Sequence, residues 1–108
     1  MAFHVAAVSL ELVAALRPLV PLVRRRDKSL ADQLVRAASS VALNVGEARY
    51  SDPGHERARF HTAAGSAGEV RVALQVAVAW GYFADADAEP ALALVDRVVA
   101  MLWRLTRR

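Results

Sequence analysis

The sequence predicts an all-α protein, an antiparallel up-and-down four-helix bundle formed by one domain over residues 1–108. Three observations predict this fold class. Apolar residues recur at steps of three and four along four segments, the connections between these segments are short, and no segment has the alternating pattern typical of β-strands. Because 56% of the 108 residues are apolar, the chain is long enough to bury one hydrophobic core.

The first helix is expected over residues 3–25. Pro18 and Pro21 lie inside this segment, and each removes an amide donor and crowds the carbonyl four residues earlier. We therefore expect a kink near Arg17 or an irregular last third of the helix. The apolar positions of the segment are Val5, Val8, Leu12, Leu16, Leu19 and Val23.

The second helix is expected from Ser29 to Tyr50, with Ser29 as its N-cap and Asp32 three residues later, as in a capping box. Polar residues lie beside its apolar side instead of opposite it, so this helix combines close packing with polar specificity. The apolar side comprises Leu30, Leu34, Ala37, Val41, Val45 and Ala48, and the polar residues beside it are Gln33, Arg36, Ser40, Asn44 and Glu47.

The third helix is expected from Pro53 to about Tyr82, and a fourth from about Ala88 to Arg107, separated by an acidic loop over residues 84–90. The second half of the third helix is apolar nearly all round, and the fourth helix has more apolar surface than one core face needs. A small domain cannot enclose such helices alone, so we expect a subunit interface. The residues assigned to it are Val72, Val76, Trp80, Phe83, Met101 and Trp103.

The charged residues suggest phosphate binding without requiring it. The net charge is +3, and all 14 basic residues except Lys28 are arginine, which pairs bidentately with phosphate. Codon usage in a GC-rich genome would explain the arginines equally well. The chain has no cysteine, no basic leader and no apolar run of the ~20 residues that a membrane span needs, so we expect a cytoplasmic protein without membrane contact.

An up-and-down bundle gathers these charges at its two ends. At the end that includes residues 24–28 and 85–89, cations and carboxylates nearly cancel. At the other end, arginines outnumber the carboxylates of Glu47, Asp52 and Glu56, and an oligomer with its copies side by side would multiply this charge. The residues expected to contact phosphate are Arg49, Arg57, Arg59, Arg104, Arg107 and Arg108.

The two central helices resemble a known family. The pattern LxxQxxRAxxSxxxNxxE from Leu30 to Glu47, followed by Phe60 and by AxGSxxE from Ala63 to Glu69, is similar to that of the small bundle proteins encoded in intervening sequences of bacterial 23S ribosomal RNA genes. The same fold group includes the accessory variability determinant of diversity-generating retroelements. The resemblance covers both central helices well and the outer helices only by pattern.

The resemblance implies a cytoplasmic homopentamer without enzymatic activity that binds structured RNA or a nucleic-acid-handling protein. The sequence departs from the family pattern at two places. Gly46-Glu47-Ala48 stands where the family often has Ala-Glu-Gly, and Ala64 replaces a residue that is usually basic. The second departure removes a potential RNA contact.

The polar residues of the pattern suggest a network across the two central helices, which would fix the register of the helices. A metal site is the alternative, but carboxylate-bridged bundles use Glu-x-x-His pairs and this chain has none. The spacing of His4, His55 and His61 does not suggest a metal site either. The residues of the expected network are Gln33, Arg36, Asn44, Glu47, Ser66 and Glu69.

No serine has a base and an orienting acid that the sequence would place beside it, so we expect no catalytic residue, no cofactor, no metal and no small-molecule substrate. The first functional hypothesis is a non-enzymatic homo-oligomer that acts as a nucleic-acid-binding or assembly accessory. The alternative is a protein-interaction module that docks on a larger partner through the apolar surface of its third and fourth helices, without nucleic-acid binding.

Overall fold

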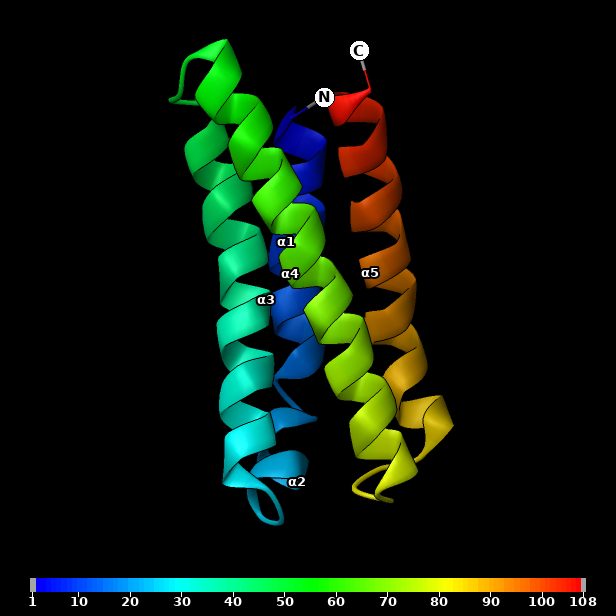
Figure 1. The fold of residues 1–108 in the computed structure, drawn as a ribbon. Helices are drawn as coiled ribbons and strands as arrows, with labels where there is room; N and C mark the ends of the chain where they lie inside the picture. Colours follow the sequence, from blue (N-terminus) through cyan, green and yellow to red (C-terminus); the bar gives the residue numbers. More distant parts are fainter. Residues whose placement is uncertain (1, 108) are drawn as a thin grey trace.

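The computed structural model describes residues 2–107, and they form four long helices and one short helix (Figure 1). The described residues contain no β-strand, which confirms the predicted all-α class. Each long helix packs on two neighbours in the cyclic order α1, α3, α4, α5, and α3 and α4 share the most extensive contact. The helices are α1 (Ala2–Leu16), α2 (Val20–Arg24), α3 (Lys28–Ala48), α4 (Pro53–Ala79) and α5 (Asp85–Thr106).

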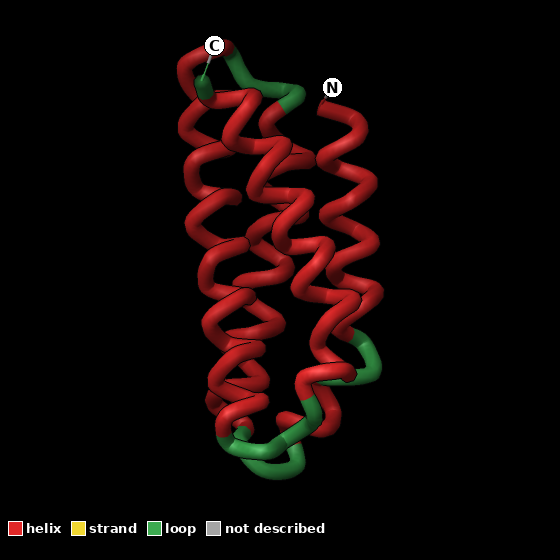
Figure 2. The backbone as a smooth tube through the Cα atoms, turned by 90° about the vertical axis from the view of Figure 1, so that its right-hand side faces the viewer, coloured by secondary structure: helices red, strands yellow, loops and turns green. Residues whose placement is uncertain are grey.

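The connections lie at the two ends of an elongated bundle (Figure 2). The α3–α4 connection lies at the same end as both chain termini, at the top of Figure 1. The short helix α2 and the α4–α5 connection lie at the opposite end. The topology is therefore the up-and-down arrangement that gathers the arginines at one end.

The first helical segment is interrupted at the prolines, as expected. Helix α1 ends at Leu16, a turn follows, and α2 begins at Val20 with Pro21 in its first turn, where a missing amide costs no helical hydrogen bond. Leu19 and Val23 remain buried on either side of this restart. The apolar face thus continues into the core although the helix does not.

The start of α3 differs from the prediction. Asp27, not Ser29, is the N-cap, and its carboxylate accepts a hydrogen bond of 3.0 Å from the backbone amide of Leu30. The extended backbone of Asp27 lets its side chain reach this amide, whereas Ser29 already lies inside the first turn. Asp32 pairs with Arg24 at 2.7 Å instead of completing a capping box, and this hydrogen bond lowers the pKa of Asp32. The helix ends at Ala48, and Tyr50 lies in the turn that follows.

Helix α4 ends at Ala79, a turn earlier than expected, because Gly81 adopts a left-handed backbone with φ of 79°. The amide of Gly81 donates to the carbonyl of Val78, and that of Tyr82 donates to Ala77, both at 2.9 Å. These two bonds form a Schellman motif, which a residue with a Cβ atom would strain.

Helix α5 begins at Asp85, so most of the segment expected as a loop is helical. The carboxylate of Asp87 accepts a hydrogen bond of 3.0 Å from the amide of Ala84, which fixes the extended N-cap residue. Pro90 lies inside the helix. A proline is less disruptive this close to a helix start than in the interior, and the expectation that Pro90 closes a loop was wrong.

One hydrophobic core runs the length of the bundle. Its largest fully buried side chains come from all four long helices. No helix among the described residues is long and apolar enough to cross a membrane. These buried side chains include Val8, Leu12, Leu34, Phe60, Leu74 and Leu102.

Candidate nucleic-acid interface

The structure brings five of the six predicted phosphate-binding arginines to one end of the bundle. Arg49 follows α3, Arg57 and Arg59 lie in the first two turns of α4, and Arg104 and Arg107 lie at the end of α5 (Figure 1). Arg108 lies outside the described residues. We call this end, with Arg49, Arg57, Arg59, Arg104 and Arg107, the basic pole.

Two of these arginines are held by contacts within the protein. The guanidinium of Arg59 pairs with Glu47 at 2.8 Å and donates to the hydroxyl of Ser51 at 3.3 Å, which joins the ends of α3 and α4. Arg57 donates a hydrogen bond of 2.8 Å to the backbone carbonyl of Thr106, at the last turn of α5. Arg59 therefore has mainly a structural role, whereas the guanidinium of Arg57, with its five N–H donors, is fixed in place and retains donors.

Two exposed aromatic rings lie among the arginines, and the sequence analysis assigned neither to this surface. The guanidinium of Arg107 lies 4.5 Å from the centroid of the Trp103 ring, and that of Arg49 lies 5.6 Å from the Tyr50 ring. Both distances suit cation–π contacts. The side chains of Tyr50 and Trp103 are 84% and 56% exposed. The basic pole thus combines cations with accessible π-faces.

The acidic residues at this end are partly neutralised. Asp52 caps α4 by accepting a hydrogen bond of 3.0 Å from the amide of His55, and its other oxygen lies 2.7 Å from the His55 ring. The backbone hydrogen bond, followed by the ring contact, lowers the pKa of the Asp52 carboxyl below its ordinary 3.8. Since Glu47 is paired with Arg59, the field outside the pole is dominated by the arginines.

The predicted cross-helix network is smaller than expected and centred on a different residue. The hydroxyls of Ser40 and Ser66 lie 2.8 Å apart across the α3–α4 contact. The side-chain amide of Asn44 donates to the Ser40 carbonyl at 2.9 Å and to its hydroxyl at 3.1 Å. Ser40 is therefore the hub, and the sequence signal for it was its place beside the apolar side of the helix.

The remaining members of the predicted network are exposed. Gln33 and Arg36 of α3 and Glu69 of α4 line an open groove of about 650 Å³ between the two helices. Within residues 2–107, no hydrogen bond or ion pair joins these three side chains to one another. Glu47 pairs with Arg59 at the basic pole instead. The expectation of one network of six residues was therefore wrong, because helical spacing places residues on a face but does not fix which rotamers meet.

The serine pair gives a testable contribution to stability. We expect Ser66→Ala to lower the free energy of unfolding by about 0.5–1.5 kcal/mol, because it removes a half-buried hydrogen bond while Asn44 still satisfies Ser40. Urea unfolding of the wild type, Ser40→Ala, Ser66→Ala and the double variant would measure it. Strictly additive losses would show that the two hydroxyls are not coupled.

The predicted interface residues do not form one surface. Phe83 is only 7% exposed and belongs to the core, so its assignment to an interface was wrong. Its burial follows from the Schellman turn, which directs the chain back over the bundle end. Trp80 and Trp103 are both exposed, but they lie toward opposite ends of the bundle. Val72 is 56% exposed, and Val76 and Met101 are partly buried.

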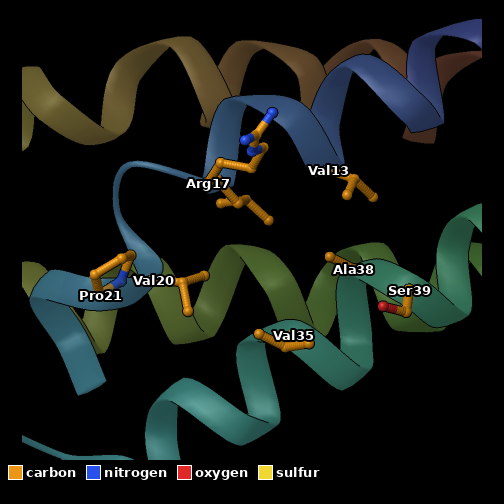
Figure 3. Close-up of a pocket in the computed structure, with 8 residues that line it drawn as sticks. Val13, Arg17, Val20, Pro21, Val35, Ala38 and Ser39 are labelled. Atoms are coloured by element: carbon orange, nitrogen blue, oxygen red, sulfur yellow. The ribbon is translucent and has the colours of Figure 1, made fainter.

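A second apolar surface, which the sequence analysis missed, lies along α1 and α3. The interruption at the prolines opens a groove of about 290 Å³ between the α1–α2 turn and α3 (Figure 3). Val13 and Val20 line one side and Val35 the other, with Val35 41% exposed. Leu10 and Leu43, on the same helices, are 64% and 60% exposed. Periodicity within one helix could not reveal a surface shared by two.

A metal site finds no support in the geometry. Among residues 2–107, no three His, Cys, Asp or Glu side chains come close enough together to hold a metal ion.

The fold and this surface define a small basic four-helix bundle protein whose cationic end carries exposed aromatic rings. The family described as 23S rRNA-intervening sequence protein matches residues 3–104. The chain therefore belongs to this family, which confirms the family resemblance of its central helices.

A solved structure has the same fold over nearly the whole chain. It is the crystal structure of a protein with unknown function from the S23 ribosomal protein family of Bacteroides thetaiotaomicron, with a TM-score of 0.88. The two sequences are 18% identical, and the match covers 96% of this chain and 99% of that chain. No curated protein matches the chain.

Proposed function

We propose that the protein is a cytoplasmic, non-enzymatic homopentamer whose basic pole binds structured RNA. The observation that carries the proposal is the juxtaposition of arginines and exposed aromatic rings at the basic pole. Arginine binds phosphate bidentately, and aromatic faces stack with unpaired bases. The resemblance to the accessory variability determinant extends the proposal to a role as a basic helper of a nucleic-acid-handling enzyme.

The position of the two apolar surfaces supports self-association into a ring. Leu10, Val35 and Leu43 mark the α1–α3 side, and Val72 and Trp80 mark the outer side of α4. Two different surfaces suit head-to-tail contacts, which close into a ring when the angle between the surfaces allows it. Neighbouring sides of a four-helix bundle are about 90° apart, which is near the angle at which four or five copies close. The number five rests on the family resemblance.

Side-by-side association would also increase the charge available to RNA. If the ring axis runs along the bundles, every basic pole lies on the same rim. A phosphate backbone that follows the rim would then contact arginines from several copies, and binding would strengthen by multivalency. A protein of modest net charge would thereby gain a strongly cationic face.

The mass of the native assembly tests this proposal. For protein purified at low salt, we expect a mass of about five times 11.7 kDa after nuclease treatment, and a higher mass with bound RNA before treatment. RNA should be released as the salt concentration rises. A monomer that retains no RNA at low salt would contradict both parts of the proposal, whereas a pentamer without RNA would contradict only the nucleic-acid part.

A further inference from the structure

A groove between α4 and α5 lies within the basic pole and has a volume of about 350 Å³. Arg57, His61 and Ala64 line it from α4, and Trp103 and Arg107 line it from α5. Its size is at the lower end of the range for ligand sites in proteins. One side chain with a π-face and three nitrogen-bearing side chains therefore surround a space open to solvent.

The two helices give the groove different chemistry on its two sides. Trp103 provides an indole that is 56% exposed, and the Arg107 guanidinium lies 4.5 Å from its ring centroid. On the α4 side, Arg57 is anchored by its hydrogen bond to the carbonyl of Thr106, so its remaining N–H donors are held at the groove edge. Such an arrangement provides a stacking surface beside a fixed phosphate-binding group.

Ala64 leaves the groove open. It is half-buried between His61 and Trp103, and its methyl group covers little of the indole. A long side chain at this position would occupy the space beside the ring. The groove thus depends on a small residue at its floor.

We propose that this groove binds one unpaired nucleotide of a single-stranded nucleic acid, with the base stacked at Trp103 and the phosphate held by Arg57. The inference rests on the proposed RNA binding and specifies which part of an RNA is recognised. Bases inside a duplex are stacked on their neighbours and cannot reach the indole, so a loop, bulge or strand end is required.

The charge of the groove also favours a nucleotide over a second copy of this chain. Arg57 and Arg107 flank the indole, and a protein surface that covered them would need carboxylates opposite both arginines. The acidic residues near the pole, Asp52 and Glu47, already pair with His55 and Arg59. A polyanion supplies the complementary charge directly.

Tryptophan fluorescence tests the stacking. In a Trp80→Phe background, Trp103 is the one remaining tryptophan, and its emission reports on the groove. We expect an oligouridylate of about 12 nucleotides to quench this emission at low salt, and the duplex of the same strand with oligoadenylate to quench it far less.

Two substitutions test the groove itself, with a matched control for each. We expect Trp103→Leu to weaken binding of the oligouridylate by about 5- to 150-fold, as loss of one stacked base does, while Trp80→Leu has little effect. Ala64→Leu should weaken binding without a change of charge, and Ala79→Leu, an exposed position at the other end of α4, should not. Circular dichroism and thermal unfolding establish that each variant is folded.

The outcomes separate this inference from the function on which it rests. If the oligouridylate binds but Trp103 is not quenched and neither substitution weakens binding, the groove proposal is wrong and RNA binding stands. Equal quenching by the duplex, or a Trp103 that iodide cannot reach in the assembled protein without RNA, would also overturn it. Absence of any RNA binding at low salt would overturn both.

Discussion

Replacing Arg49, Arg104 and Arg107 together by alanine is expected to weaken RNA binding about 100-fold at 0.1 M salt. Each arginine that contacts phosphate contributes about 0.7–0.9 to the slope of log affinity against log salt, so three lost contacts lower the slope by about 2. The electrostatic contribution vanishes near 1 M salt, and a slope change of 2 corresponds to two decades at 0.1 M. Titrations of RNA with protein at several salt concentrations measure both quantities.

The opposite end of the bundle provides a control with the same change of charge. Arg17, Arg25 and Arg26 are exposed and lie away from the basic pole. Their replacement by alanine should leave the slope nearly unchanged, because they are not placed to contact the same RNA. If both triple variants lost affinity equally, net charge alone would explain binding, and the basic pole would have no special role.

The largest loss of stability is expected for Leu34→Ala, at about 2–5 kcal/mol in the free energy of unfolding. Leu34 is 0% exposed and lies at the centre of α3, which packs on α1, α2 and α4. Its truncation removes buried apolar surface and leaves a cavity that the surrounding helices fill only partly. Urea unfolding at a fixed protein concentration, followed by circular dichroism, measures the change.

Leu43→Ala is the matched control, since it makes the same chemical change on the same helix at a residue that is 60% exposed. We expect it to alter the stability of the protomer by less than about 0.5 kcal/mol. Its effect should appear instead in the assembly mass if the α1–α3 surface is an interface. Equal losses for Leu34→Ala and Leu43→Ala would contradict the position of the core.

The helices and the core could be predicted because each depends on the pattern within one segment. The residues that recur along 30–48 are buried in the structure, and the interruption at Pro18 and Pro21 follows from the covalent chemistry of proline. The basic pole followed from topology alone, since short connections force neighbouring helices to be antiparallel.

Helix boundaries were harder to predict because several residues compete for the same role. Asp27 and Ser29 can both cap a helix, and the backbone conformation of Asp27 decides between them. In the same way, Gly81 could end α4 or lie within it, and the two hydrogen bonds of the Schellman motif decide. The burial of Phe83 is a consequence of that choice.

The candidate site was predicted in its charge but not in its detail. The sequence analysis selected Arg57 and Arg107 but assigned Trp103 to an oligomer interface and treated Ala64 as a lost contact. Their meeting in one groove depends on the lateral alignment of α4 and α5, which no single-helix pattern determines. The same limit hid Ser40, whose partner Ser66 lies on another helix.

The far end of the bundle is closed by a contact that complements the open basic pole. The hydroxyl of Tyr82, just after α4, donates a hydrogen bond of 3.2 Å to the carboxylate of Asp27, which also caps α3. Partial burial, followed by the nearby Asp27 charge, raises the pKa of Tyr82 above 10.0, so the phenol keeps its proton and remains a donor. The first and second halves of the chain are thus joined covalently at one end and by this bond at the other. Sequence variation at the basic pole can therefore alter recognition while the opposite end keeps the helices aligned.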